Sequence, residues 1–170
     1  GIGVIFILGS CGSLGLIKAF ELKAYCSLLQ ELLLALELLE TEVQYRQNPL
    51  VLAFAEVGQR LNPHGAGVLF CKAAEYLQLQ PDQLPATGWN YGVEALAKQI
   101  PSSSLLRDFL LSFGQGLGRS DLASQAKLFN LLRQQLKQCL TQAQSQRQQE
   151  ERMWQYLGFG AGTGLILLLL

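Results

Sequence analysis

Residues 22–43 read LKAYCSLLQELLLALELLETEV, and this stretch decides the fold class. Its apolar side chains recur at steps of three and four, which is the spacing of one face of an amphipathic helix and not of a strand. That seam consists of Leu22, Tyr25, Leu29, Leu32, Leu36, Leu39 and Val43. Additional leucines beside the seam widen the apolar face, so the helix needs partners on more than one side, as an inner helix of a bundle has.

Turn residues divide the following segment into three further helices. Asn48 is expected to cap a second helix from Pro49 to about Leu61, because proline suits the first helical turn. A third helix is predicted from about residue 68 until just before Pro81, and a fourth over residues 86–98.

Two more helices are predicted beyond residue 100. A fifth starts at Pro101-Ser102-Ser103-Ser104, buries Leu105, Leu106, Phe109, Leu110 and Phe113, and is closed by Gly114, Gly116 and Gly118. A sixth, very long helix begins at Ser120-Asp121, which fits an N-cap followed by an acid. No stretch alternates like a strand, so we predict an all-α fold, an antiparallel bundle of about six helices over residues 18–152.

Composition limits the class of protein. The chain has 170 residues, with 13 basic and 13 acidic side chains that make up only 15% of it. The balanced charge argues against a nucleic-acid binder, and the length favours a single domain. The four cysteines are far apart in sequence, which is typical of reduced packing residues.

The apolar residues are concentrated at the two ends of the chain. Residues 1–17 and 153–170 contain no charge, and each run predicts a transmembrane helix that flanks the helical domain. Lys18, Lys23, Arg147 and Arg152 lie on the inner side of these runs, so the positive-inside rule places residues 18–152 in the cytoplasm. Buried core helices, a cleaved signal sequence, or a lipoprotein signal ending at Cys11 are the alternatives.

Glycines are spaced four apart in the last run. Gly158 with Gly162, and Gly160 with Gly164, form small-xxx-small patterns. Such patterns favour close helix packing in lipid, either between the two runs or with another membrane protein.

No set of residues with the spacing of a catalytic or metal site is present. His64 is the only histidine, and it lies in the turn sequence Asn62-Pro63-His64-Gly65, where a solvated loop histidine is expected. We therefore predict no enzyme activity, no metal and no cofactor. A small hydrolase that uses His64 is the enzyme alternative.

The acidic residues Glu37, Glu40 and Glu42 form the most concentrated charged group. They are interpreted as a solvated face or as the contact for a basic partner, with acid/base catalysis as a third option.

The order of these features resembles a known family. The segments that carry the resemblance are residues 38–45 (LLETEVQY), 48–50 (NPL), 113–121 (FGQGLGRSD) and 152–158 (RMWQYLG). Over essentially its whole length the chain resembles the stage III sporulation protein AB family. Residues at matching positions are Glu40, Glu42, Tyr45, Pro49, Gly114, Leu117, Gly118, Ser120, Asp121 and Gln125.

The resemblance implies a role that composition and periodicity do not reach. It implies a cytoplasmic bundle like the F domain of type II secretion and type IV pilus platform proteins, in the mother-cell membrane of an endospore-forming bacterium. It further implies a non-enzymatic platform that docks a secretion-type ATPase, stage III sporulation protein AA, and joins the other stage III A channel proteins. Glu40 and Glu42 have no evident role in the fold and are the preferred ATPase contacts, whereas Asn48, Pro49, Gly114, Gly118, Ser120 and Asp121 suit helix corners.

Alternatives to this role stay open. A fragment of a secretion or pilus platform protein would carry similar features, although such proteins usually have two of these domains. A membrane-tethered coiled-coil adaptor would form an elongated parallel oligomer. A homo-oligomer in the membrane is also compatible with the sequence.

Overall fold

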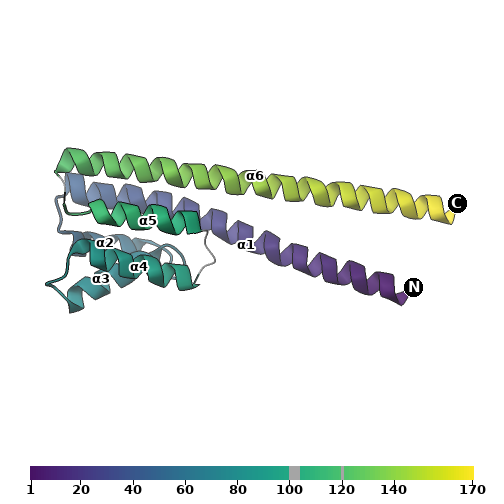
Figure 1. The fold of residues 1–170 in the computed structure, drawn as a ribbon, viewed down its shortest axis with the longest axis horizontal. Helices are drawn as coiled ribbons and strands as arrows, with labels where there is room; N and C mark the ends of the chain where they lie inside the picture. The colour runs from purple at the N-terminus through teal and green to yellow at the C-terminus, as the bar shows by residue number, and fades with distance from the viewer. Residues whose placement is uncertain (100–103, 120) are drawn as a thin grey trace. The chain divides into compact units, whose positions relative to one another are not determined.

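Helices connected by short turns make up the described residues of the chain. The computed structural model describes residues 1–99, 104–119 and 121–170, without the side chains of residues 4 and 7–14. Its elements are α1 (Ile2–Glu40), the π-helix η1 (Thr41–Tyr45), α2 (Leu50–Arg60), α3 (Gly67–Leu79), α4 (Pro85–Gln99), α5 (Ser104–Gly116) and α6 (Leu122–Leu169) (Figure 1). Six α-helices and no strand in this described part confirm the predicted all-α class.

The chain forms two compact units. One is the continuous segment Ser27–Leu140, and the other consists of Gly1–Cys26 together with Thr141–Leu170. The continuous unit is thus shorter than the predicted domain over residues 18–152. The glutamine-rich stretch 142–151 is helical within α6, as the lack of proline and glycine predicts.

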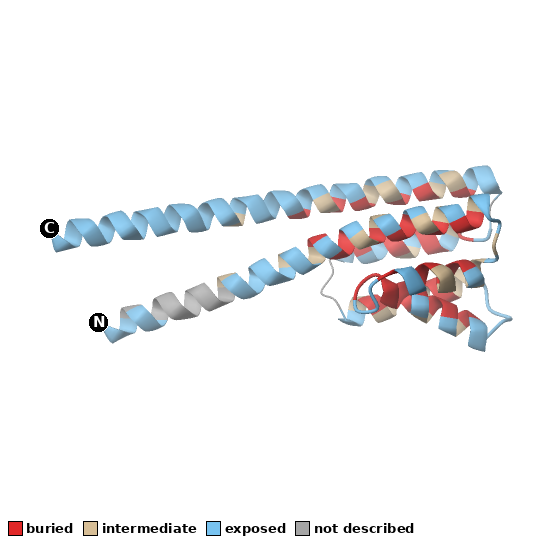
Figure 2. Cartoon of the chain, turned by 180° about the vertical axis from the view of Figure 1, so that it is seen from behind, coloured by how far each residue is buried: buried red, intermediate tan, exposed pale blue. Residues whose placement is uncertain are grey.

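The unit Ser27–Leu140 has a conventional apolar core. The seam of α1 is buried from Leu29 to Leu39, and it continues into η1 at Val43. Buried residues lie on α2–α5 and on the parts of α1 and α6 that belong to this unit (Figure 2). The predicted burial of Leu105 is wrong, because this residue is exposed. Leu106, Leu110 and Phe113 of α5 are buried as predicted.

A row of aromatic rings forms the centre of that core. Trp89 of α4 lies between Phe54 and Phe70 on one side and Phe113 on the other, with ring centroids 5.7, 5.5 and 5.2 Å away. Phe113 in turn contacts Phe129 of α6 at 5.2 Å. The indole N–H of Trp89 donates a hydrogen bond of 2.7 Å to the carbonyl of Leu110, so the one polar atom of this side chain has a partner.

The glycines after Phe113 have separate roles. Gly114 lies inside α5, where a Cβ atom would overlap the ring of Trp89, so it permits close packing and does not terminate the helix as predicted. Gly118 lies in the turn before α6 with a φ of +77°, a backbone conformation that residues with a Cβ atom rarely adopt.

The helix ends correct two predicted caps. Pro49, not Asn48, is the residue before α2, and no side chain caps this helix. Asp121 precedes α6, and its carboxylate accepts a hydrogen bond of 3.3 Å from the backbone N–H of Ser124. Hydrogen bonds from the side chain and then the backbone of Ser124 lower the pKa of Asp121. Ser120 lies outside the described residues, as do 101–103 at the predicted start of the fifth helix.

The unit of the two chain ends is mostly exposed. Every residue from 153 to 170 is exposed, including Leu165 to Leu170. Within the described residues, none of the helices contains a segment with the length and apolarity needed to cross a membrane.

Candidate functional site

Glu42 is the most buried charged residue of the predicted acidic group. It lies in η1 and is only 2% exposed. Its carboxylate accepts a hydrogen bond of 3.0 Å from Arg46 Nη1 and one of 2.7 Å from Asn48 Nδ2. Both oxygens are therefore satisfied by side chains that follow Glu42 by four and six residues.

The backbone around Glu42 is unusual at three points. The N–H of Arg46 donates to the carbonyl of Thr41 five residues earlier, which is the π-helical spacing, and the N–H of Asn48 donates to the carbonyl of Glu42. Gln47 adopts a φ of +54° at the position where a glycine often ends a helix. Together these features turn the chain from η1 into α2.

These contacts correct the expected role of Glu42 and of Asn48. Glu42 stabilises the corner between η1 and α2 through its hydrogen bonds. Because it is almost fully buried, it offers no surface for contact with a partner. Asn48 serves the same corner as a hydrogen-bond donor instead of capping α2. The spacing Glu-x3-Arg-x-Asn was the available signal in the sequence.

Glu40 also has a partner within the fold. Its carboxylate pairs with Arg133 of α6, and the two side chains are 21% and 26% exposed. The expectation that Glu40 lacks a role in the fold is therefore wrong. The ion pair joins two elements that lie 93 residues apart in sequence, which no local pattern could reveal.

Glu37 is the exposed member of the acidic group. Its backbone carbonyl accepts a hydrogen bond of 2.9 Å from Thr41 Oγ1, and its side chain forms no ion pair with another described residue. Beyond it, Tyr45 is 80% exposed and the side chain of Arg46 is 56% exposed. We call Glu37, Tyr45 and Arg46 the η1 surface.

A fourth glutamate, which the sequence did not single out, supports another helix. Glu31 of α1 accepts a hydrogen bond of 2.9 Å from the backbone N–H of Ala66, the residue before α3. A carboxylate at the positive end of a helix stabilises it. The adjoining residue His64 is exposed, and only its backbone N–H is engaged, by Asn62.

The described part of the chain contains no cluster of three or more His, Cys, Asp or Glu that could hold a metal ion. Among the described residues, Cys26, Cys71 and Cys139 form no disulfide.

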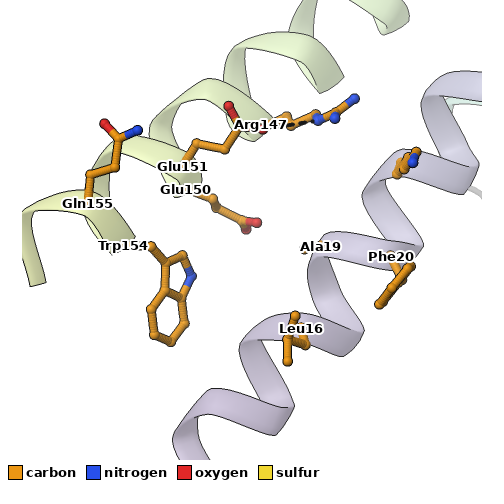
Figure 3. Close-up of a pocket in the computed structure, with 9 residues that line it drawn as sticks. Leu16, Ala19, Phe20, Arg147, Glu150, Glu151, Trp154 and Gln155 are labelled. Atoms are coloured by element: carbon orange, nitrogen blue, oxygen red, sulfur yellow. Dashed lines mark ion pairs between the residues drawn. The ribbon is translucent and has the colours of Figure 1, made fainter. Parts of the chain in front are cut away.

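The unit of the chain ends contains a groove of about 370 Å³. α1 lines it with Leu16, Ala19, Phe20 and Lys23, and α6 lines it with Arg147, Glu150, Glu151, Trp154 and Gln155 (Figure 3). Gly15 lies so close to the Trp154 ring that a Cβ atom there would overlap it. This is a close approach that glycine at position 15 permits.

The predicted packing glycines of the last run have no neighbour among the described side chains. A Cβ atom at Gly158, Gly160, Gly162 or Gly164 would meet nothing within 4 Å. Packing of these glycines against another protein stays a prediction.

Comparisons with known proteins agree on one family. The chain matches the family described as stage III sporulation protein AB over residues 1–170. It is 29% identical over 142 residues to stage III sporulation protein AB of Bacillus subtilis (strain 168), covering 84% of this chain and 82% of that protein. A solved structure of stage III sporulation protein AB has the same fold, with a TM-score of 0.69 and 22% identity over 74% of this chain and 98% of the other. Since the family match covers every residue, the chain belongs to the stage III sporulation protein AB family.

Proposed function

We propose that this chain is a non-enzymatic platform protein of the stage III sporulation channel, held at the mother-cell membrane by its two ends. The family match over residues 1–170 carries the proposal. A compact helical unit over Ser27–Leu140, in a chain whose two terminal stretches 1–17 and 153–170 carry no charged side chain, is a suitable arrangement for such a platform. The partners in this proposal are the secretion-type ATPase, stage III sporulation protein AA, and the other stage III A proteins.

Membrane attachment in this proposal is supported by the exposed apolar ends. Leu165 to Leu170, at the end of the chain, are all exposed, and Trp154 and Tyr156 precede them. Such a helix surface costs free energy in water and gains it in lipid, and aromatic rings favour the interface between the two. The basic residues lie inward of both ends, which favours a cytoplasmic position for Ser27–Leu140.

The η1 surface is our candidate for ATPase docking. Tyrosine and arginine are frequent hot-spot residues of protein interfaces, and Tyr45 and Arg46 lie on a corner that Glu42 makes rigid. A rigid contact loses less conformational entropy on binding than a mobile one. Glu37 adds an exposed carboxylate for a basic partner residue.

A binding assay with the purified ATPase tests this proposal. The full chain in mild detergent is titrated with stage III sporulation protein AA, and saturable binding is expected. Tyr45→Ala and Glu37→Lys should each weaken it about tenfold, because each removes or reverses an exposed contact. Asp82→Lys is the matched control, since Asp82 is an exposed acid outside the η1 surface.

The variants are chosen to leave the fold intact. Charge reversal at Glu42 is unsuitable, because it would place a cation beside Arg46 in a buried site. Unchanged binding by both η1 variants, with unchanged helicity, would remove the η1 surface from the proposal. Failure of the unaltered full chain to bind would remove ATPase docking itself.

A further inference from the structure

The groove in the unit of the chain ends is divided into an apolar and a charged half. Along α1, Leu16, Ala19 and Phe20 precede Lys23, and along α6, Arg147, Glu150 and Glu151 precede Trp154. The charged part of each helix is thus the part farther from its chain end, and on α6 the part nearer the end consists of Trp154 and the uncharged Gln155. Because both chain ends belong to this one unit, the groove is amphipathic along its length (Figure 3).

The charges of the groove sum to zero but are not all paired with each other. Arg147 Nε lies 3.4 Å from Glu151 Oε1, so these two side chains form an ion pair. Lys23 and Glu150 form no ion pair with another described residue, and the carboxylate of Glu150 points towards α1 (Figure 3). The groove therefore offers one cation and one carboxylate beside an apolar wall.

We infer that this groove binds one phospholipid molecule with a zwitterionic headgroup that carries a primary ammonium. Lys23 binds the phosphate, Glu150 accepts hydrogen bonds from the ammonium, and an acyl chain lies against Leu16, Phe20 and Trp154. A volume of about 370 Å³ lies in the range of roughly 300 to 1,000 Å³ that is typical of ligand pockets. A purely anionic headgroup fits less well, because it would bring a second negative charge towards Glu150.

The inference rests on the proposed function only for the contact with a membrane. It does not require either helix to span one, because an amphipathic groove can take up a lipid at the surface of a bilayer. The indole of Trp154 suits this position, since its ring contacts acyl chains while its N–H remains near polar groups.

A soluble short-chain lipid tests the groove without a bilayer. The full chain in mild non-ionic detergent is titrated with dihexanoyl-phosphatidylethanolamine below its critical micelle concentration, and native mass spectrometry counts the bound molecules. We expect one lipid for each chain. Dihexanoyl-phosphatidylglycerol should bind about tenfold more weakly, and O-phosphoethanolamine, which has the headgroup without acyl chains, should not bind measurably.

Three variants locate the bound lipid. Ala19→Trp fills the groove with a ring and should abolish binding. Lys23→Gln removes the unpaired cation and should weaken binding about tenfold. Lys18→Gln is the matched control, because Lys18 is on the same helix but does not line the groove, and it should bind like the unaltered chain.

The outcomes separate this inference from the proposed function. Equal lipid retention by Ala19→Trp, Lys23→Gln and Lys18→Gln would overturn the groove site. The site would also be overturned if the unaltered chain formed a dimer without bound lipid and Ala19→Trp made that dimer dissociate. Binding of O-phosphoethanolamine as tightly as the lipid would also overturn it. Flotation with phosphatidylethanolamine–phosphatidylglycerol vesicles tests attachment separately. A chain that binds the short-chain lipid as expected but does not float contradicts the membrane attachment and supports the groove.

Discussion

The unit Ser27–Leu140 and the unit of the chain ends are both rich in leucine, but their leucines differ in burial. Leu29 of the first is fully buried, whereas Leu168 of the second is 88% exposed. In residues 22–43 apolar residues recur at every third or fourth position, so they form one helix face that neighbouring helices can cover. Residues 165–170 are apolar on all sides, and a single neighbouring helix cannot cover them. Periodicity, rather than apolar content, therefore indicates which leucines enter a protein core.

The two tryptophans provide the strongest test of this difference. Trp89→Ala should lower the free energy of unfolding by about 3 to 5 kcal/mol, because it leaves a cavity among three aromatic rings and removes the donor to Leu110. Trp154→Ala in the other unit should change it by less than about 0.5 kcal/mol. Thermal melting of the full chain, followed by circular dichroism, measures both. Equal losses would mean that the two units share one core.

Removal of Glu42 is the next largest expected effect. Glu42→Ala leaves the side-chain amide of Asn48 without its acceptor, whereas Arg46 is 56% exposed and can turn to water. We therefore expect the free energy of unfolding to fall by about 2 kcal/mol, which is less than for a broken, fully buried ion pair. Glu37→Ala, three residues from Glu40 and exposed, is the control and should be neutral. Denaturant unfolding at neutral pH compares them. A neutral Glu42→Ala would contradict the role of this carboxylate in the corner.

The Glu40–Arg133 ion pair should contribute less. Both side chains are partly exposed, so Arg133→Ala is expected to cost about 1 kcal/mol. Arg107→Ala breaks the more exposed pair with Glu94 and should cost less than that. A double-mutant cycle of Glu40→Ala and Arg133→Ala isolates the pairwise energy. A coupling energy of zero would show that the ion pair does not stabilise the bundle.

The smallest effect on folding should come from the chain end. Leu167→Ser should leave the melting of Ser27–Leu140 unchanged, because Leu167 is exposed and lies outside that unit. The same change should reduce retention of the full chain on phospholipid vesicles, measured by flotation. Leu34→Ser, an exposed leucine of the compact unit, is the control and should not affect flotation. A melting shift in Leu167→Ser would contradict the separation of the two units.

Much of the fold could be predicted from periodicity and turn residues. The seam of α1, the helices near α3 and α4, and the uninterrupted α6 follow from local spacing and from the absence of proline. The helix caps were less predictable, because several residues near each end could serve. Before α2, Asn48 donates its Nδ2–H to Glu42, and no side chain caps the helix.

The burial and the partners of the acidic group could not be predicted for a different reason. Glu37, Glu40 and Glu42 are close together in sequence, and at the regular pitch of an α-helix Glu42 would lie outside the seam of Leu36, Leu39 and Val43. Glu42 is buried because η1 changes the pitch, and Glu40 is held by a residue of a distant helix. Both causes depend on tertiary structure. The groove at Trp154 likewise requires two helices from opposite ends of the chain.

The π-helical turn has a consequence for how insertions and deletions act at this place. The hydrogen bond from Arg46 to Thr41 closes a loop one residue longer than an α-helical one. Deletion of one residue from 41–45 would let α1 continue with ordinary pitch, and every later side chain of the turn would rotate by about 100° around the helix axis. The shortened chain would have almost the same composition and hydropathy, yet Glu42, Arg46 and Asn48 would no longer meet. Loss of a single codon at this point would therefore be more damaging than most substitutions in the same segment.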